Sequence, residues 1–387
     1  MAAGLKPIRR VVTGNDERGR SKVVWDGPAP GAHEASPGAG RGHTNFWVWN
    51  DSPPALTDTQ DVGDLHYDFP GPAGGGHLRV VQSRTKPENY DPAQDPGYVA
   101  DHAPRIRPPG RTWDRGGNNA FSSPMHKTET VDYGILLEGE RVLVLDDREL
   151  LMKAGDICVQ VGAWHKWTSY GPGSLMAFDM FAAKFVDGEV GLAQGNDKVI
   201  RADPALKLPE GVKPARRIVT IDREPGRGVL VSDGPAPDVR FDPARPGFAS
   251  ARLWVTDSTP AKIVYETLHL PHSIVPPARG TVLRVVTFPP DERWKGKVGP
   301  NEVAAYFQAM GSPGASTYSA QAPHPYMQKT NTLDFCLVLE GEIVLVLDTQ
   351  EVGVKGGDIV IVRGSNHSWS NRSAHPAVLA IASHAAA

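Results

Sequence analysis

Two histidines, His126 and His165, could bind one metal ion if the chain folds back between them, and a carboxylate, Asp132, lies in the interval. Imidazole and carboxylate groups are ligands for Fe, Mn, Ni, Cu and Zn. Two histidines and one carboxylate around an ion with open positions suit non-haem Fe(II) oxygen chemistry. The sequence therefore predicts a metal site formed by His126, Asp132 and His165.

This site requires a specific chain path. In one straight strand, at about 3.3 Å per residue, the six steps from His126 to Asp132 would separate their side chains by about 20 Å. We therefore expect a turn at residues 128–130, so that His126 and Asp132 come from adjacent strands. A third strand must then bring in His165.

The stretch Met125–Trp167 occurs a second time as Met327–Trp369, with 22 of the 43 aligned positions identical and no gap. The segment Arg9–Pro30 likewise recurs as Arg216–Pro237. Looking for repeats first reveals a tandem duplication over nearly the whole chain. We predict two domains, residues 1–205 and 206–387, joined by a polar, proline-bearing linker.

The second copy differs at the candidate metal site. Asp334 and His367 are kept, but Gln328 replaces the first histidine. Two protein ligands rarely hold a catalytic ion. We therefore expect no metal in the second copy, which is structural or binds an organic ligand.

Residues beside the candidate ligands could act on a substrate. The candidate catalytic residues are Tyr133 and Glu129, and the candidate substrate-binding residues are Lys127, Thr128, Trp164 and Trp167. Trp164 could wall a pocket for an aromatic substrate, or it could be plain packing. Tyr133 could equally cap a polar contact. Trp167 recurs as Trp369, which also suits a core residue.

The remaining pattern indicates an all-β protein. Short runs of leucine and β-branched residues are bounded by Gly-Glu and Gly-Asp turns, which favours strands. The 35 Pro and 41 Gly imply short strands and many loops. We interpret Pro70–Ser123 and Pro289–Pro323 as loops, with a short helix at Glu302–Met310. Many short strands with almost no helix indicate a sandwich or barrel.

Composition excludes several function classes. The 387 residues carry a net charge of −3, so no basic surplus points to nucleic acid. No apolar run approaches the roughly 18 residues of a membrane helix, and the N-terminus lacks the apolar core of a secretory signal. We expect a cytoplasmic protein with a small-molecule substrate, and leave homo-oligomerisation open.

The scattered histidines have no ligand spacing and are interpreted as surface or loop residues: His33, His43, His66, His77 and His102.

These motifs resemble the cupin superfamily, whose first motif is H-x-H, three or four residues, E, six residues and G. His126 and Asp132 match its first histidine and its glutamate, whereas Thr128 stands at the second histidine. The second motif, a Gly-Asp start with a later glycine and a histidine, is matched one residue short, at Gly155, Asp156, Gly162 and His165. The resemblance implies a bicupin, two double-stranded β-helix barrels of jelly-roll type in tandem.

The resemblance also implies a function, although fold alone does not choose among reactions. We expect a metal-dependent enzyme acting on a small organic molecule, aromatic ones included, with an Fe(II)-type dioxygenase or oxidoreductase favoured. The expected cofactor is a divalent transition metal in the first barrel, Fe(II) ahead of Mn, Ni and Zn. The alternatives are a metal-dependent isomerase, lyase, decarboxylase or cyclase, and a non-catalytic small-molecule-binding bicupin.

Overall fold

A computed structural model describes residues 4–56, 61–63, 69–108, 110–186 and 199–387. Two large β-sheets form its body, and the prediction of an all-β protein built from two barrels is confirmed. The strands are the runs of valine, isoleucine and leucine expected from the sequence. Such side chains pack well on a pleated surface with a buried face.

The first large sheet contains most strands of the first half of the chain. Its main path runs β15-β14-β11-β9-β13-β5-β4-β3, and β10, β12 and β18 pair outside this path. The bounds are β3 (Gly31–Glu34), β4 (Gly42–Trp49), β5 (Gly76–Ser83), β9 (Thr130–Val144), β10 (Glu149–Lys153), β11 (Ile157–Val161), β12 (Lys166–Thr168), β13 (Ser174–Phe185), β14 (Arg216–Glu224), β15 (Arg227–Pro235) and β18 (Ala261–Ile263).

The second large sheet contains most strands of the second half, in the order β16-β17-β19-β25-β20-β23-β1-β2. The bounds are β1 (Arg9–Asn15), β2 (Ser21–Pro28), β16 (Asp238–Phe241), β17 (Ala249–Val255), β19 (Thr281–Phe288), β20 (Thr332–Glu340), β23 (Ile359–Arg363) and β25 (Ala377–Ala385). Two three-stranded sheets complete the barrels. They are β6 (Arg105–Arg107), β7 (Thr112–Asp114) and β8 (His126–Thr128) in the first half, and β21 (Glu342–Leu347), β22 (Glu351–Lys355) and β24 (His367–Ser370) in the second.

The two regions interpreted as loops differ from each other. The predicted helix is confirmed as α1 (Pro300–Ala309), and short 3-10 turns flank it at Asp291–Arg293 and Pro313–Ala315. The loop interpretation of Pro70–Ser123 was wrong in part, because it contains β6 and β7 as well as β5 and a 3-10 turn at Pro92–Gln94. The three-residue strands β6 and β7 are too short to show periodicity, whereas the eight-residue strand β5 was long enough and was missed. No helix in the described ranges is both long and apolar enough to cross a membrane.

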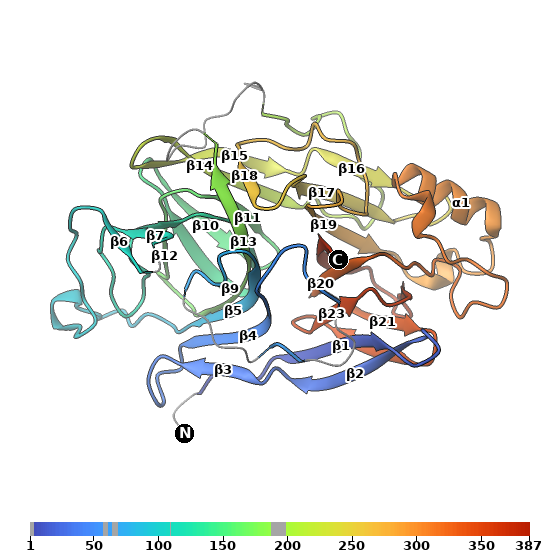
Figure 1. Cartoon of the computed structure of the whole chain (residues 1–387), viewed down its shortest axis with the longest axis horizontal. Helices are drawn as coiled ribbons and strands as arrows, with labels where there is room; N and C mark the ends of the chain where they lie inside the picture. The colour runs from blue at the N-terminus through green and yellow to red at the C-terminus, as the bar shows by residue number, and fades with distance from the viewer. Residues whose placement is uncertain (1–3, 57–60, 64–68, 109, 187–198) are drawn as a thin grey trace.

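Each half of the chain lends its first hairpin to the sheet of the other half. Strand β1 pairs in parallel with β23, so that Val11 lies opposite Val360. Strand β14 pairs in parallel with β11 in the same way, with Ile218 opposite Cys158. Figure 1 shows the blue β1 and β2 beside the red β23, and β14 beside the green β11. The two barrels are therefore joined by reciprocal backbone pairing, whereas the domain boundary near residue 205 stays a prediction.

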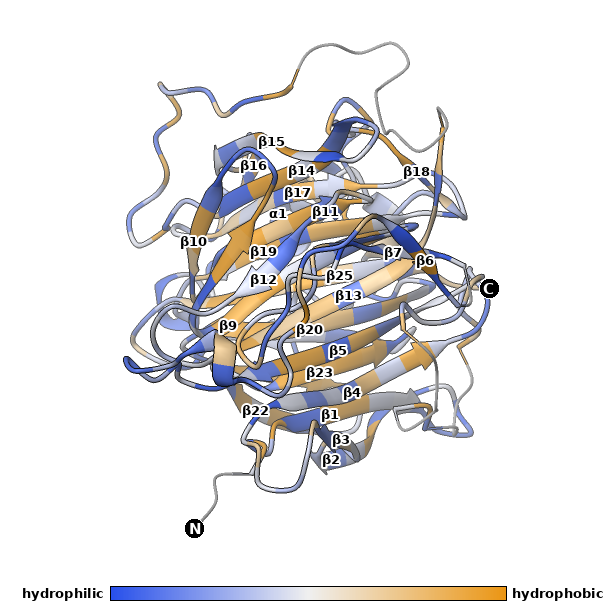
Figure 2. Ribbon diagram, turned by 90° about the vertical axis from the view of Figure 1, so that its left-hand side faces the viewer, coloured by the Kyte–Doolittle hydropathy of each residue, from blue (hydrophilic) through white to orange (hydrophobic). Residues whose placement is uncertain are grey.

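Side chains alternate between two cores along the central strands. On β9, Tyr133, Ile135 and Leu137 face a hydrophobic cluster that both halves share. Leu136, on the opposite face, packs inside the first barrel with Met176. Strands have a side-chain period of two, so adjacent residues are assigned to different cores. Figure 2 shows the central strands coloured largely as hydrophobic.

A buried ion pair crosses between the halves. Lys127 Nζ on β8 donates to Asp222 Oδ2 on β14 at 3.1 Å, and both side chains are 0% exposed. Asp222 Oδ1 also accepts a hydrogen bond from the backbone N–H of Trp164 at 2.7 Å. A buried carboxylate needs such partners because removal from water is costly. The pair therefore helps to fix the exchanged hairpin of the second half against the first barrel.

We expect Lys127→Met to lower the free energy of unfolding by about 3 to 5 kcal/mol, because it leaves a carboxylate buried without its cation. Adding Asp222→Asn removes that charge and keeps an acceptor for the N–H of Trp164. The double variant should therefore regain part of the loss in urea denaturation. If the stability costs of the two single substitutions simply add in the double variant, Lys127 and Asp222 are not directly coupled.

Candidate metal centre in the first barrel

The structure brings His126 and His165 side by side. His126 begins β8, and His165 directly precedes β12. Each backbone N–H donates to the carbonyl oxygen of the other residue at 2.9 Å, which forms an isolated antiparallel bridge. The two imidazole centroids lie 4.4 Å apart, with the rings tilted by 48°. Two histidines that are far apart in the sequence therefore lie together in one local site.

Hydrogen bonds to the backbone fix the tautomer of both rings. His126 Nδ1 lies 2.8 Å from the carbonyl oxygen of Pro124, and His165 Nδ1 lies 2.9 Å from that of Ala163. A carbonyl only accepts, so each Nδ1 carries the proton and each Nε2 keeps a free lone pair. Burial lowers the pKa of both imidazoles, that of His165 well below its usual value. Two neutral imidazoles with the same tautomer are the form that binds metal.

The third predicted ligand, Asp132, lies near the start of β9. The chain leaves one sheet at Glu129 and enters another, since β8 pairs with β7 and β9 pairs with β11 and β13. The expected break at residues 128–130 is therefore present. Thr128 Oγ1 and Thr130 Oγ1 lie 2.6 Å apart, and Thr130 hydrogen-bonds the carboxyl group of Asp132.

Asp132 is a buried carboxyl with spare hydrogen-bonding capacity. The residue is 4% exposed, and its Oδ1 has no hydrogen-bond partner among the described residues. Burial raises its pKa to about 7, against the smaller effect of the Thr130 hydrogen bond. Asp132 follows the same face of β9 as Leu136, which is the face inside the first barrel.

Three other predicted site residues point away from the histidine pair. Lys127 contacts Asp222, as described above. Trp164 stacks against the guanidinium group of Arg115, whose central carbon lies 4.3 Å from the ring centroid. Tyr133 hydroxyl lies 2.6 Å from Thr281 Oγ1 in the core shared by the halves. Each directly follows or precedes a candidate ligand, so strand alternation turns it to the opposite face.

The remaining predicted residues lie near the pair. Trp167 is 4% exposed, and its ring centroid is 5.9 Å from that of His165. Thr128 is buried and belongs to the hydroxyl chain toward Asp132. Glu129 is half-buried at the sheet change, where its carbonyl accepts from Arg111 Nη2 at 3.0 Å. Of these three, Trp167 is the one in ring contact with a candidate ligand.

Sequence reasoning missed the polar group behind His126. Asp114 on β7 is the cross-strand neighbour of His126, and it is 0% exposed. It forms an ion pair with Arg107, and His102 Nε2 lies 2.9 Å from its Oδ1. Asp114 and His102 come from the region interpreted as loop, so no motif pointed to them. Interpreting His102 as a loop residue was correct for its backbone but missed this contact.

A second correction concerns His77 on β5. It was interpreted as a surface or loop histidine, yet it is fully buried. Both His77 and Asp132 are cross-strand neighbours of Met180, on either side of β13. His66, interpreted in the same way, lies outside the described residues. A lone histidine inside a strand gives no spacing signal, which is why the sequence could not place His77.

Comparison with known proteins identifies the family. No family model matches the chain. A cupin-domain-containing oxidoreductase of Aspergillus ruber is 28% identical over 176 residues, which are 45% of this chain and 70% of the relative. Another from Neurospora crassa is 46% identical over 55 residues, 14% of this chain and 28% of the relative. The chain belongs to the cupin superfamily.

Further matches to this cupin are short or distant. A cupin-domain-containing oxidoreductase of Hypocrea virens is 48% identical over 46 residues, 12% of this chain and 24% of the relative. The shorter matches thus span only about a quarter of their relatives. Among solved structures, a putative glyoxylate-induced protein of Pseudomonas aeruginosa has a TM-score of 0.36 at 13% identity, covering 80% of this chain and 74% of that one. A salicylate 1,2-dioxygenase of Pseudoaminobacter salicylatoxidans has a TM-score of 0.34 at 11% identity, covering 80% and 72%.

The cupin metal site is only partly assembled here. Across the described residues, no three His, Cys, Asp or Glu side chains gather closely enough to hold one ion. Asp132 therefore does not complete a three-ligand set with His126 and His165 in this conformation. The donor chemistry of the two imidazoles still fits a divalent transition metal, with its other positions left for water or substrate.

The second barrel fills the equivalent position with a hydrogen bond. Gln328 and His367 form the same backbone bridge, with N–H to carbonyl distances of 2.8 and 2.9 Å. His367 Nδ1 lies 2.9 Å from the carbonyl oxygen of Ser365, as in the first barrel. Here, however, the Gln328 amide nitrogen lies 3.3 Å from His367 Nε2. The lone pair that is free in the first barrel is therefore occupied in the second.

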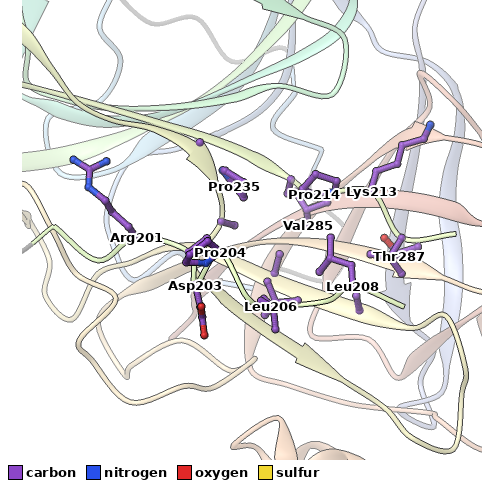
Figure 3. A pocket seen from close by; sticks show the side chains of 18 of the residues that line it. Arg201, Asp203, Pro204, Leu206, Leu208, Lys213, Pro214, Pro235, Val285 and Thr287 are labelled. Atoms are coloured by element: carbon purple, nitrogen blue, oxygen red, sulfur yellow. The ribbon is translucent and has the colours of Figure 1, made fainter. Parts of the chain in front are cut away.

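A separate cavity of about 510 Å³ lies under the linker between the repeats. It is lined by residues of the linker and of β15, β17 and β19. Figure 3 shows Leu208 of the linker close to Val285 of β19. None of the predicted site residues lines this cavity. It is therefore distinct from the candidate metal centre.

The stability of the metal-free protein should depend on pH through Asp132. Its folded-state pKa of about 7 exceeds the unfolded value near 4, so the stabilisation is complete below pH 4 and is lost as pH rises through 7. Between pH 5 and pH 8 we expect the advantage of Asp132→Asn over the wild type to grow by about 2 to 3 kcal/mol. Urea denaturation at a series of pH values measures this difference. A pH-independent difference would show that the carboxyl does not titrate in this range.

Proposed function

We propose that this cupin is a metal-dependent oxidoreductase that acts on a small organic molecule in its first barrel. An Fe(II)-type dioxygenase reaction is the form we favour. One observation carries the proposal: His126 and His165 hold two neutral imidazoles together, and no described residue hydrogen-bonds to the Nε2 lone pair of either ring. The cupin-domain oxidoreductases among its sequence relatives support the same class.

Each residue of the site has a definable task. His126 Nε2 and His165 Nε2 would hold the ion, and the backbone carbonyls behind them keep both rings in the ligating tautomer. A divalent transition metal such as Fe(II) would supply open positions for substrate and oxygen, and it would mediate the transfer of electrons from the substrate, which is oxidised, to oxygen, which is reduced. Trp167 lines the interior beside His165 and excludes water with its indole ring.

Asp132 is suited to proton transfer. A general acid or base works best when its pKa is near the working pH, and burial raises the pKa of Asp132 to about 7. Its unpartnered Oδ1 can accept or donate one proton, and Thr130 steadies the carboxyl group. The same properties would serve a metal-dependent isomerase or lyase, because both move protons beside a Lewis acid.

Non-catalytic binding is the second candidate, and a specific observation favours it. Catalytic zinc sites commonly have three protein ligands, but the described part of the chain offers two. A two-ligand site would bind metal weakly. Metal content therefore separates the two candidates.

We expect His126→Ala to remove most of the bound metal, whereas Gln328→Ala leaves the metal content unchanged. The reason is that His126 provides a free Nε2 and Gln328 does not. Elemental analysis of protein purified without added metal measures both variants against the wild type. A wild type far below one metal per chain, with no rescue of activity by Fe(II), Mn(II), Ni(II) or Zn(II), would favour non-catalytic binding. If both variants keep the wild-type metal, the ligand assignment is wrong.

The second barrel offers a gain-of-function test. Gln328→His should place a second imidazole beside His367, because the backbone bridge there is already the same as in the first barrel. We expect the metal content per chain to rise toward twice the wild-type value under saturating metal. The double variant Gln328→His with His367→Ala is the matched control, and it should show no gain. No additional metal in Gln328→His would mean that the backbone bridge does not suffice to build the site.

A further inference from the structure

A buried arginine inside the first barrel, Arg141, has no anionic partner among the residues that the structure describes. Arg141 lies on β9, where it is the cross-strand neighbour of Met152, a residue of the core inside that barrel. Its side chain is 8% exposed, and its Nε and Nη1 atoms are buried without a hydrogen-bond partner. Among the described residues, its one recorded contact as a cation is with the ring of Trp167, whose centroid is 5.9 Å from the guanidinium carbon.

Such a residue is costly to the folded protein. A buried charge is normally paired or hydrogen-bonded, because removal from water strongly disfavours the charged form. Burial lowers the pKa of Arg141 to about 10, which still leaves the guanidinium charged at neutral pH. No anion among the described residues offsets this cost, so a bound ligand could supply the partner.

The second barrel shows that the fold does not require this arginine. The residue at the equivalent position of the repeat is Ile343, which is 2% exposed in the core of that barrel. The neighbouring residues Val142 and Leu143 recur as Val344 and Leu345. A charge at this position of the repeat is therefore specific to the barrel that holds the histidine pair, although the second barrel buries another arginine, Arg284, elsewhere.

Position relates Arg141 to the candidate metal centre. The indole of Trp167 neighbours both the guanidinium group of Arg141 and the imidazole of His165, each 5.9 Å from the ring. One small organic molecule could therefore contact Arg141 at one end and a metal held by His126 and His165 at the other. We propose that Arg141 binds a carboxylate group of the substrate, which makes the substrate of the first barrel a small organic acid. This inference rests on the proposed function.

The geometry of the donors favours a carboxylate over other anions. Arginine presents its N–H groups in a planar fork that matches the two oxygens of a carboxylate, and such bidentate pairs are strong when water is excluded. Phosphate sites usually gather several donors and positive charges. Arg141 is a single cation in an otherwise largely apolar core that includes Leu143, Met152 and Trp167.

Matched small probes test the assignment by calorimetry. Benzoate and benzamide share a ring and differ in charge, and inorganic phosphate tests for a general anion site. We expect the wild type to bind benzoate at least about tenfold more tightly than benzamide, and Arg141→Met to lose that preference. Arg148→Met removes the same charge from a side chain that is 51% exposed, and it should keep the preference.

A second measurement, of the melting temperature, tests whether Arg141 has only a structural role. If the arginine is unpaired without ligand, Arg141→Met should unfold at the same temperature as the wild type or higher. A clearly lower melting temperature, with the benzoate preference intact in any folded fraction, would overturn the proposal. Equal binding of benzoate and benzamide by the wild type would also overturn the proposal. So would a wild type that binds phosphate as tightly as benzoate and an Arg141→Met variant that no longer binds phosphate, because the site would then bind anions in general.

The His126→Ala variant separates this proposal from the proposed function. If Arg141 binds the carboxylate, the benzoate preference survives in His126→Ala even when the metal is lost. A preference that disappears in His126→Ala and remains in Arg141→Met would assign carboxylate binding to the metal and overturn the role of Arg141. If the wild-type protein shows the benzoate preference but no activity that depends on a metal, only the proposed oxidoreductase reaction is contradicted.

Discussion

The candidate site depends on one pair of backbone hydrogen bonds, between His126 and His165. These bonds place the start of β8 beside the residue that precedes β12, and they do not require a histidine at the first position. The second barrel proves the point, because Gln328 and His367 make the same bridge. The backbone therefore presents two side chains to each other, and only their identity decides between two free lone pairs and one internal hydrogen bond. A single exchange of histidine and glutamine can change the chemistry without changing the fold.

Alternation along the strands explains what the sequence could and could not predict. The repeat, the strands and the meeting of the two histidines followed from motifs and turn residues. Lys127, Tyr133 and Trp164 were grouped with the ligands because they adjoin them in sequence, yet adjacent residues in a strand face opposite sides. A strict period of two, counted from His126, Asp132 and His165, would have assigned all three to the other face.

Other features had no signal in a single sequence. Asp114 is the cross-strand neighbour of His126 and lies on a three-residue strand, which is too short to show periodicity. The exchange of hairpins was invisible because β1 and β14 carry nearly the same residues, so nothing in either indicates which copy it pairs with. Arg141 did have a signal, since an arginine faces Ile343 in the repeat alignment. A charge opposite an aliphatic residue at a core position marks a difference in side-chain chemistry between the duplicated domains.

Both barrels bury charged side chains, but they differ at one position of the repeat. In the second barrel, Arg245 donates to Asp242 at 2.6 Å and stacks on Tyr326, with its guanidinium carbon 3.6 Å from the ring centroid. Its charge is thus neutralised within the chain and enclosed by aromatic rings, as expected of a stable core. Asp132 and its counterpart Asp334 are both buried with an unpartnered Oδ1, and Arg284 of the second barrel has a buried Nε without a partner among the described residues. Unsatisfied carboxyl groups alone therefore do not distinguish the two barrels. The difference lies at Arg141, whose place in the second barrel is taken by Ile343. A ligand can complete a group that the chain leaves open, and the duplication allowed the two barrels to differ at this position while they kept one fold.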